Sequence, residues 1–381
     1  MTLRNLRPLL YSLLLVSLHP IGSSAAPAPE AQALIDELGL TAASQPLAER
    51  ADWKPARVVV ALPPRMSKMS PEYEEQLRAA AGDIELVFDR SGNLAPSAEM
   101  LAGADAFIGF CSPLVLKNAG DQLLWLHNYP VGMDQCTGAS SAQLQKIIFT
   151  NTKRLSGPAI AEHTLAMLLA LTHNLPAYVQ AQQQAKWQRN LSANVTFGEL
   201  KGKTLLVAGL GGIGTEIAWR AHGLGMRVIA TRNSSRTGPA FVEYVGLADE
   251  LFKLAGQADV VVNTLPLTPA TNGLFNKAFF NAVKPGAIYL SVGRGQTTVT
   301  ADLIAALEAG TLFGAGLDVT DPEPLPGDSP LWRMPNVIIT PHVATAGGES
   351  TQRSIIIAVE NLRRYVAGEA LLNVVDLGKG Y

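Results

Sequence analysis

The sequence carries little charge and no excess of positive charge. Of its 381 residues only 16% are Asp, Glu, Lys or Arg, whereas 48% are apolar, and the formal net charge is −2. A composition this apolar is typical of globular proteins and excludes an intrinsically disordered chain. Because there is no basic surplus, we expect no nucleic-acid partner. The length is sufficient for two domains, each with a core of its own.

The N-terminal apolar run is too short to span a bilayer. Residues 9–18, L-L-Y-S-L-L-L-V-S-L, follow Arg4 and Arg7 and precede a series of small residues that ends at Ala26. This is the layout of a secretory signal peptide. Neither a twin-arginine pair nor a cysteine accompanies it. We therefore expect residues 1–26 to be cleaved off and the protein to be exported by the general route, or to be cytoplasmic if the start codon is misassigned.

Cysteine is scarce, since Cys111 and Cys136 are the only two. In a cytosolic protein they would be ordinary buried thiols, whereas in an exported protein they could form a disulfide. Both follow the ends of strand-like runs that we expect to be neighbours, residues 104–110 and 122–127. Contact between the two sulfur atoms is therefore possible, but the pattern does not require it.

Short apolar runs alternate with helical stretches along most of the chain. One such series occupies residues 57–151, and a second runs from K-T-L-L-V-A (203–208) to N-V-I-I-T (336–340). Between them lies an apolar helical stretch, residues 158–175, which continues through the polar residues 177–189. The alternation predicts the α/β class, with parallel sheets covered by helices.

Three polar residues lie in Gly/Pro frames at the ends of late strand-like runs. Arg294 lies in S-V-G-R-G, Glu323 in D-V-T-D-P-E-P-L and His342 in I-T-P-H-V-A. The carboxyl ends of parallel strands gather in one crevice, where ligands bind. An arginine there can hold a substrate carboxylate by forked hydrogen bonds. A histidine can move a proton while a glutamate keeps it oriented and protonated, so the trio suits reduction of a carbonyl beside a carboxylate.

A glycine-rich turn opens the second series of strands. The segment G-L-G-G-I-G directly follows the strand-like T-L-L-V-A and precedes a helix. Glycines at this spacing permit a tight turn, close approach of the backbone to a pyrophosphate, and close packing of helix on strand. The helix N-terminus then faces the phosphates. We expect a dinucleotide site formed by Gly209, Gly211, Gly212, Ile213 and Gly214.

The next strand favours NADP(H) over NAD(H), with NAD(H) as the alternative cofactor. Its end, I-A-T-R-N-S-S-R (229–236), carries no acidic residue that would bind the ribose 2′-hydroxyl. Arg232 and Arg236, together with Ser234, could instead hold a 2′-phosphate. The alternative interpretation is that both arginines are solvated surface residues.

In this order and spacing, the motifs resemble the D-isomer-specific 2-hydroxyacid dehydrogenases, a family that includes glyoxylate/hydroxypyruvate reductases. The resemblance covers residues 56–375 and also rests on N-T-K-R-L-S-G-P-A-I-A-E-H and L-P-L-T-P-A-T. It implies two Rossmann-like, doubly wound parallel-sheet domains, with the cofactor domain inserted into a discontinuous substrate domain. The signal peptide at 1–26 is the largest departure from the family, and an N-terminal extension at 27–55 follows it. The division that the resemblance implies for the rest of the chain is a flavodoxin-like substrate domain at 56–152 and 343–381 and an NAD(P)-binding domain at 153–342.

The resemblance also implies roles for residues on the substrate side. Arg294 would grip the carboxylate and carbonyl of a 2-keto acid, and His342 would be the acid/base paired with Glu323. In the loop Y-P-V-G-M-D (129–134), the backbone N–H groups of Val131 and Gly132 would meet the substrate carboxylate. The implied reaction is hydride transfer between NAD(P)H and a 2-keto acid or D-2-hydroxy acid, in the reductive direction.

On the cofactor side, Asp318 would lie near the nicotinamide carboxamide. Further contacts to the cofactor would come from Leu265, Pro266, Thr271, Val292 and Gly293, and no metal site is expected. Members of the family are commonly homodimers through the cofactor domain, which suits the apolar stretch at 158–175. The chain departs from the family at Thr320, where an aromatic residue is frequent, and at Gly347, where Ser or Thr is frequent.

Two other functions remain alternatives at this point. One is an exported, non-catalytic protein that binds a keto acid or a nucleotide, although retention of Arg294, Glu323 and His342 argues against it. The other is a phosphite-type dehydrogenase of the same superfamily; formate enzymes, which pair the histidine with a glutamine, are disfavoured by Glu323. The remaining histidines of the mature chain are expected to be structural, with His163 at the domain hinge: His127, His163, His173 and His222.

Overall fold

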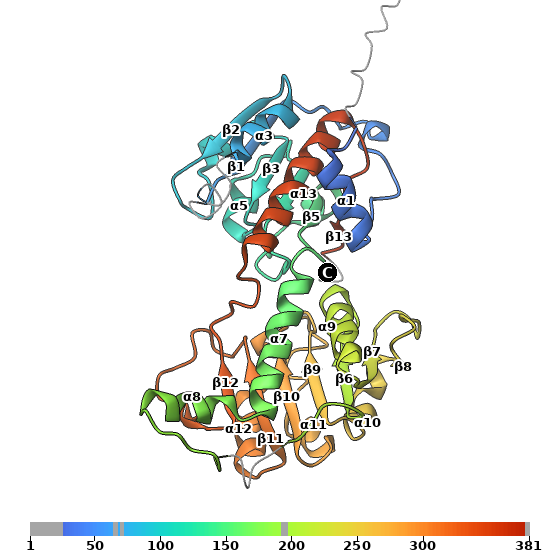
Figure 1. Ribbon diagram of the computed structural model, residues 1–381. Coiled ribbons are helices and arrows are strands. Elements are labelled where there is room, and N and C mark those ends of the chain that lie inside the picture. The colour runs from blue at the N-terminus through green and yellow to red at the C-terminus, as the bar shows by residue number, and fades with distance from the viewer. Residues whose placement is uncertain (1–25, 64–67, 69–71, 192–196, 378–381) are drawn as a thin grey trace, which may run out of the picture.

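The computed structural model describes residues 26–63, 68, 72–191 and 197–377. It contains two sheets, each covered by helices, which form two units placed one above the other (Figure 1). The predicted α/β class is confirmed. Apart from Ala26, the expected signal peptide lies outside the described residues. In the described part of the chain, no helix is both long enough and apolar enough to cross a membrane.

The first sheet has the strand order β13-β5-β4-β3-β1-β2, with only β13 antiparallel. Without β13 this is the flavodoxin-like order of doubly wound folds. The sequences of its central strands are nearly continuous apolar runs, because helices cover both faces of the sheet. The strands are β1 (Arg57–Ala61), β2 (Glu85–Asp89), β3 (Ala106–Gly109), β4 (Trp125–Asn128), β5 (Ile148–Asn151) and β13 (Val374–Val375).

Helices bury apolar side chains against both faces of the first sheet. On one face, α3 and α13 pack against each other and contribute Leu77, Leu362 and Tyr365 to the core. On the other face, α5 contributes Val115 and Leu116. The helices of this unit are α1 (Pro29–Leu38), η1 (Leu47–Glu49), α3 (Tyr73–Ala81), α4 (Ala98–Leu101), α5 (Pro113–Asn118), α6 (Ser141–Lys146) and α13 (Gly348–Ala367).

The N-terminal residues 27–55 pack onto this first unit. Helix α1 lies against α13, and Ala42 forms an antiparallel bridge with Leu372. Leu38 and Leu40 are buried in a small core with Ile357. Since α13 and β13 come from the end of the chain, the first unit combines N-terminal and C-terminal segments (Figure 1).

The second sheet is wholly parallel, with the order β12-β11-β10-β9-β6-β7-β8. The strand order reverses between β6 and β9, which is the switch point where such sheets bind ligands. The short strand β8 was not foreseen from the sequence. The strands are β6 (Thr204–Ala208), β7 (Arg227–Thr231), β8 (Tyr244–Gly246), β9 (Val260–Asn263), β10 (Ala287–Ser291), β11 (Leu312–Leu317) and β12 (Val337–Ile339).

Each face of the second sheet is covered by an apolar core. One of these cores includes α7 (Gly157–Thr172) and α9 (Gly212–Gly223), which pack against each other. The prediction of one continuous helix from residue 158 was wrong. The chain breaks at His173 and at Asn174, whose φ of 52° is left-handed. The helices are α7 (Gly157–Thr172), α8 (Leu175–Gln183), α9 (Gly212–Gly223), η2 (Ala248–Glu250), α10 (Leu251–Ala255), α11 (Lys277–Ala282), η3 (Gly295–Thr297), α12 (Thr300–Glu308) and η4 (Pro330–Arg333).

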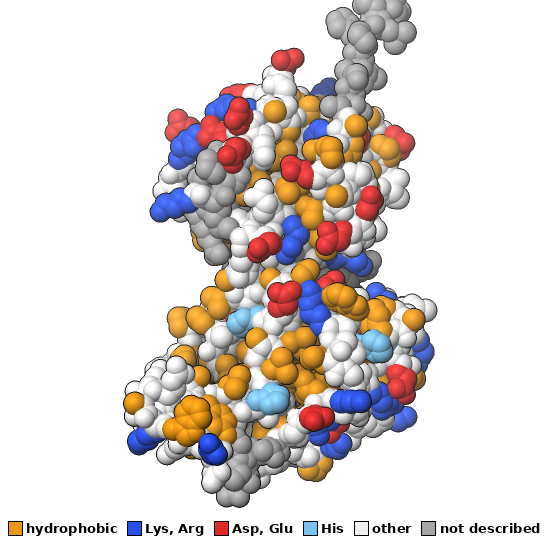
Figure 2. All heavy atoms as spheres, in the orientation of Figure 1, with side chains coloured by type: hydrophobic (Ala, Val, Ile, Leu, Met, Phe, Trp, Pro, Cys, Tyr) orange, Lys and Arg blue, Asp and Glu red, His pale blue; other side chains and the backbone are white. Residues whose placement is uncertain are grey.

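The two units are joined by a narrow waist, visible in the space-filling view of Figure 2. The chain crosses it just before α7 and again between β12 and α13 (Figure 1). Because the second crossing follows β12, the carboxyl ends of β10, β11 and β12 lead directly to the junction with the first unit. On the face shown in Figure 2, Lys and Arg side chains are interspersed with Asp and Glu.

Candidate active site

The structure brings the three predicted residues to one edge of the second sheet. Arg294 follows β10, Glu323 follows β11 and His342 follows β12, and these strands are consecutive neighbours. All three strands are parallel, so their carboxyl ends lie at the same edge. The site is thus assembled from three loops supported by a rigid sheet.

The glycines on each side of Arg294 let its loop lie against two neighbouring segments. A Cβ atom on Gly293 would lie 2.5 Å from the carbonyl oxygen of Leu265, and one on Gly295 would overlap the backbone of Thr320. Real Cβ contacts are never this close, so only glycine fits at either position. The S-V-G-R-G frame therefore fixes the backbone from which Arg294 projects.

Arg294 projects toward the first unit and meets the loop at residues 129–134. Its Nε donates to Asp134 at 2.9 Å, and its Nη1 donates to the carbonyl of Gly293 at 2.8 Å. A Cβ atom on Gly132 would overlap Nη2 of the arginine, so the loop passes directly over the guanidinium. The arginine and the predicted substrate-side loop are therefore in contact across the junction of the units.

The loop carrying Val131 and Gly132 is held through its carbonyl groups. Asn151 donates to the carbonyl of Val131 at 2.6 Å, and Asn128 donates to that of Gly132 at 2.9 Å. The N–H groups of Val131 and Gly132 donate to no other group in the described part of the chain. Both thus remain available to a ligand anion, and their contact with a substrate carboxylate stays a prediction.

His342 and Glu323 form a hydrogen-bonded pair. The distance from His342 Nδ1 to Glu323 Oε2 is 3.0 Å, and the other carboxylate oxygen accepts from the backbone N–H of Thr320 at 3.1 Å. The side chains of the histidine and the glutamate are 46% and 40% exposed, so a substrate can reach the ring. Because Nδ1–H donates to the carboxylate, Nε2 is the ring nitrogen that faces a reacting group.

The backbone of His342 has a left-handed φ of 53°, and the end of β11 holds it there. Its N–H donates to the carbonyl of Asp318 at 2.8 Å. The buried carboxylate of Asp318 accepts from Thr340 Oγ1 at 2.7 Å and from the N–H groups of Val343 and Ala344 at 2.9 and 3.0 Å. Asp318 therefore anchors the loop that carries the histidine, and its contact with nicotinamide stays a prediction.

His163 reinforces the same anchor from α7. Its Nε2 lies 2.9 Å from Thr340 Oγ1, which in turn donates to Asp318. These contacts place His163 beside the loop that carries His342, and its expected role at the domain hinge stays a prediction. His127 is also structural, because it is fully buried and burial lowers its pKa to about 3.

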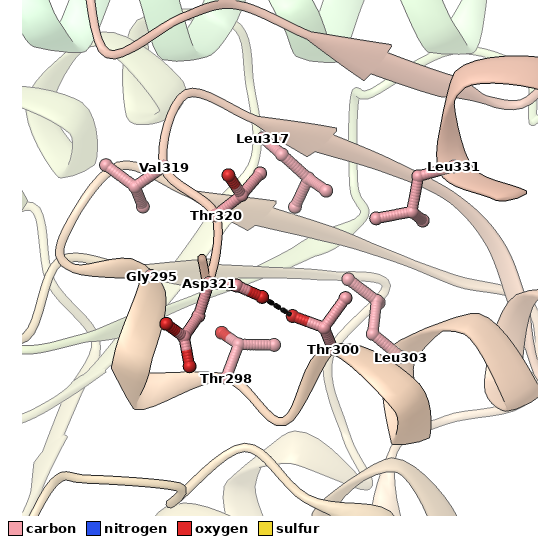
Figure 3. A pocket seen from close by; sticks show the side chains of 9 residues that line it. All are labelled: Gly295, Thr298, Thr300, Leu303, Leu317, Val319, Thr320, Asp321 and Leu331. Carbon is pink, nitrogen blue, oxygen red and sulfur yellow. Dashed lines mark hydrogen bonds between the residues drawn. The ribbon is translucent and has the colours of Figure 1, made fainter. Parts of the chain in front are cut away.

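A small pocket lies beneath the loop that carries Glu323 (Figure 3). The hydroxyl of Thr300 points toward Asp321 and donates to its carbonyl at 2.7 Å. Leu303, Leu317, Val319 and Leu331 form the apolar part of the lining. These contacts seat the loop after β11 on the start of α12, and neither His342 nor Arg294 lines the pocket.

The glycine turn has the geometry that a dinucleotide needs. Gly209, after β6, has a left-handed φ of 101°, and a Cβ atom on Gly214 would overlap the carbonyl oxygen of Gly209. Helix α9 therefore begins in close contact with the strand. A Cβ atom on Gly211 would have no heavy atom within 4 Å, so the turn is open above the helix N-terminus. This opening and the N–H groups of the first helical turn, which have no intrahelical acceptor, fit a pyrophosphate.

Other predicted cofactor residues surround this turn. Leu265 lies against Gly209, since a Cβ atom added to Gly209 would be 3.0 Å from Cδ2 of the leucine. The hydroxyl of Thr271 donates to the carbonyl of Pro266 at 2.6 Å and so closes the loop after β9. Ile213 is partly buried against the core beneath the turn. The structure thus gathers these residues at the switch point of the sheet.

The two arginines after β7 differ in their partners. The turn is tied to this strand, because the N–H of Leu210 donates to the carbonyl of Thr231 at 2.8 Å. Arg232 donates to the carbonyl of Thr237 at 2.9 Å and is partly exposed. Arg236 pairs with Glu250 at 2.5 Å. Arg232 is thus the better placed of the two to hold an anion.

Glu250 competes for Arg236. A hydrogen bond from the Tyr244 hydroxyl, with further ones from the Leu247 N–H and Arg236, lowers the pKa of Glu250 to about 2. The carboxylate is therefore charged at neutral pH. A ligand phosphate would have to displace it from Arg236.

Sequence reasoning did not single out Asp134 or Asn128. Asp134 was visible as the last residue of the Y-P-V-G-M-D loop, but its pairing with Arg294 joins residues 160 positions apart. Asn128 ends β4, and nothing in the sequence marks its amide as the group that holds the loop. No cluster of three or more His, Cys, Asp or Glu side chains suited to a metal ion occurs among the residues with described positions.

Comparisons with known proteins agree with this geometry. Residues 165–344 match the family model of the D-isomer specific 2-hydroxyacid dehydrogenase, NAD binding domain. The chain is 34% identical to a hydroxypyruvate reductase of Blautia hydrogenotrophica, over 62% of this chain and 74% of that protein. It is 30% identical to glyoxylate/hydroxypyruvate reductase B of Escherichia fergusonii, over 74% of this chain and 90% of that protein.

A solved structure has a similar overall fold. The NADPH-dependent glyoxylate/hydroxypyruvate reductase of Sinorhizobium meliloti, in complex with NADP and sulfate, superposes with a TM-score of 0.68. The two sequences are 28% identical, and the match covers 86% of this chain and 100% of the other. The similarity therefore extends over both units.

Proposed function

Because the chain belongs to the D-isomer specific 2-hydroxyacid dehydrogenases, we propose that it reduces a 2-keto acid of the glyoxylate or hydroxypyruvate type with NADPH. The observation that carries this proposal is that Arg294 and the His342–Glu323 pair follow the carboxyl ends of three neighbouring parallel strands of the second sheet. A nicotinamide cofactor belongs to the family's chemistry, whereas the preference for NADPH and the keto acid itself are the proposed parts.

Arg294 binds and orients the substrate. Two of the five N–H donors of its guanidinium are used by Asp134 and the Gly293 carbonyl. The others bond to no other group within the described residues, and Nη2 lies next to Gly132 of the loop across the junction. A 2-keto acid carboxylate placed there receives forked hydrogen bonds from the arginine and backbone donors from the loop. The carbonyl carbon is thereby fixed at the end of β10.

His342 supplies the proton. When bound, the nicotinamide supplies the hydride for the carbonyl carbon. Protonated His342 then donates from Nε2 to the carbonyl oxygen while Nδ1–H stays on Glu323 at 3.0 Å. The carboxylate keeps the ring in this orientation. In the reverse direction neutral Nε2 accepts the proton of the D-2-hydroxy acid.

The cofactor would be held at the switch point between β6 and β9. The N–H groups at the start of α9 would meet the pyrophosphate, and the loop at 265–271 would line the adenosine side. Arg232, next to the turn, would receive the 2′-phosphate that distinguishes NADPH from NADH. The absence of an acidic residue at the end of β7 supports this preference.

Two further proposals concern the whole protein. Export rests on the layout of residues 1–26 and is tested by N-terminal sequencing of the mature protein from periplasmic and cytoplasmic fractions. A homodimer through the second unit rests on the apolar character of α7 and the partly exposed Leu175 and Val179 of α8. Light scattering on the purified protein distinguishes dimer from monomer.

A panel of 2-keto acids assayed with NADPH and NADH in parallel tests the proposed activity. We expect turnover with glyoxylate or hydroxypyruvate, faster with NADPH, and none with the His342→Ala variant under the same conditions. Phosphite with NADP⁺ is included in the panel. Binding of a keto acid without turnover by the wild-type protein would contradict the proposal and support a binding protein.

A further inference from the structure

The only two cysteines of the chain form a disulfide beside the substrate loop. Cys111 lies just after β3 and Cys136 lies in the segment after β4, with their Cα atoms 4.9 Å apart. Both are buried, at 4% and 7% exposure. The bond therefore joins two loops at the carboxyl edge of the first sheet, the edge that faces Arg294.

A buried amide links the same two loops. Asn128 accepts from the N–H of Cys111 at 2.9 Å and donates to the carbonyls of Pro130 and Gly132 at 3.0 and 2.9 Å. Asn128 thus holds the start of the loop. The disulfide holds its end, where the N–H of Cys136 donates to the carbonyl of Met133 at 2.8 Å.

The part of the loop between these two attachments carries the substrate contacts. It includes Gly132, which lies over Arg294, and Asp134, which pairs with the arginine Nε at 2.9 Å. Asp134 is two residues from Cys136. A change in the position of Cys136 is therefore transmitted directly to the carboxylate that orients Arg294.

We propose that the Cys111–Cys136 disulfide is a positioning element for the substrate carboxylate, so that the affinity for the keto acid depends on the redox state of this bond. The substrate named in this inference rests on the proposed function. The mechanism, a loop held in place by a covalent bond, rests on the disulfide. In the dithiol form the end of the loop is free to shift, and Gly132 and Asp134 lose their fixed positions relative to Arg294. An oxidising compartment keeps the bond intact, which agrees with the proposed export.

The dithiol form is obtained with a water-soluble phosphine. The disulfide accepts two electrons and two protons and becomes two thiols, while the phosphine takes the oxygen of a water molecule and becomes its oxide. Alkylation followed by intact-mass measurement verifies each state. Re-oxidation by oxidised glutathione, which is itself reduced to two thiols, returns the protein to the starting state.

The experiment compares the oxidised wild type, the reduced wild type and the double variant Cys111→Ser/Cys136→Ser, each with and without phosphine. We expect reduction to raise the wild-type KM for the keto acid about tenfold, equivalent to about 1.4 kcal/mol of binding. The kcat should change much less, because the loop acts mainly on binding. The Kd of NADPH should stay constant, since the glycine turn lies on the other sheet. The double variant should show the raised KM and no response to phosphine.

Amide hydrogen exchange of the peptide covering residues 129–136 gives a readout independent of activity. We expect faster exchange in the reduced protein and in the double variant, with peptides of α9 unchanged. Equal exchange and equal KM in the two redox states would overturn the inference, and re-oxidation that fails to restore the KM would do the same. If exchange responds as expected but no keto acid is turned over, the proposed function fails while the tethering of the loop stands.

Discussion

The guanidinium of Arg294 occupies the space that a side chain at position 132 would need. A Cβ atom on Gly132 would overlap the arginine Nη2 and would lie 2.6 Å from Oδ1 of Asp134. Gly132→Ala should therefore push Arg294 away from its position and lower kcat/KM for the keto acid about a hundredfold, the typical cost of displacing a reacting group by about 1 Å. Steady-state kinetics and a crystal structure of the variant measure the effect and the displacement.

Gly223→Ala is the matched control for this substitution. Gly223 ends α9, and an added Cβ atom there would meet no heavy atom within 4 Å. Its kinetics should equal those of the wild type. Wild-type kinetics for Gly132→Ala would show that the loop does not constrain Arg294. They would contradict the proposed binding of the substrate carboxylate between Arg294 and the loop at residues 129–134.

The His342–Glu323 pair predicts a hierarchy of kinetic effects. His342→Ala should lower kcat by about two to four orders of magnitude, the usual contribution of a general acid. Glu323→Gln should lower kcat less, because the ring keeps a hydrogen-bond partner but loses the negative charge beside it. The double variant should be no worse than His342→Ala, since residues that act as one unit are not additive. Turnover under saturating substrate and NADPH measures all three.

The exposed His222 of α9 provides the control for this series. It lies on the same unit but belongs to no predicted site, so His222→Ala should retain wild-type kcat. Near-normal turnover of His342→Ala would remove the proton-transfer role from this residue. Additive effects in the double variant would show that the two side chains act separately.

Cofactor selectivity should depend more on Arg232 than on Arg236. Arg236 is occupied by Glu250 at 2.5 Å, whereas Arg232 has only a backbone carbonyl as its partner in the described structure. Arg232→Ala should raise the KM for NADPH tenfold or more, given about 1.5–3 kcal/mol for a hydrogen bond to a charged group. The KM for NADH should hardly change, because NADH lacks the 2′-phosphate.

Arg227→Ala is the control for cofactor selectivity. Arg227 lies at the opposite end of β7 and pairs with Glu243 at 2.7 Å. Arg227→Ala removes one positive charge at the end of β7 that lies away from the glycine turn. The ratio of the KM for NADPH to the KM for NADH should therefore stay unchanged. Equal effects of Arg232→Ala on NADPH and NADH would contradict a 2′-phosphate site at this arginine.

Much of this site was predictable because it depends on local patterns. Arg294 and His342 each follow an apolar run within a Gly/Pro frame, and the ends of parallel strands meet at one edge. The glycine spacing at 209–214 likewise describes a turn whose geometry involves only adjacent residues. The placement of Arg294 and His342 at one edge therefore followed from the parallel arrangement expected of their strands.

The parts that were missed depend on contacts between distant segments. The pairing of Asp134 with Arg294 and the clamp formed by Asn128 cross from one loop to another, and no local pattern encodes them. The disulfide was left open for the same reason. The break at Asn174 was missed because the helical pattern was extended through Pro176 into the polar residues that follow, whereas a single left-handed residue ends the helix.

The buried His127 predicts a loss of stability at acidic pH. Burial lowers its pKa to about 3, and its Nε2 has no hydrogen-bond partner among the described residues. In the unfolded chain the ordinary pKa is about 6.5, so below that pH the unfolded state binds a proton that the folded state does not. The free energy of unfolding should therefore fall by about 1.4 kcal/mol per pH unit as the pH drops from about 6 to 4, from this residue alone.

His127→Asn isolates this contribution from those of the carboxylates. The asparagine amide can still bond to Thr150, which lies 2.9 Å from the histidine Nδ1, but it does not titrate. Urea unfolding measured from pH 7 to pH 4 should give a shallower pH dependence for the variant, although its stability at pH 7 is lower because the smaller side chain leaves a cavity. Parallel curves for the two proteins would mean that His127 is not held neutral in the folded state. The difference in slope, not the difference in stability at one pH, is therefore the decisive quantity.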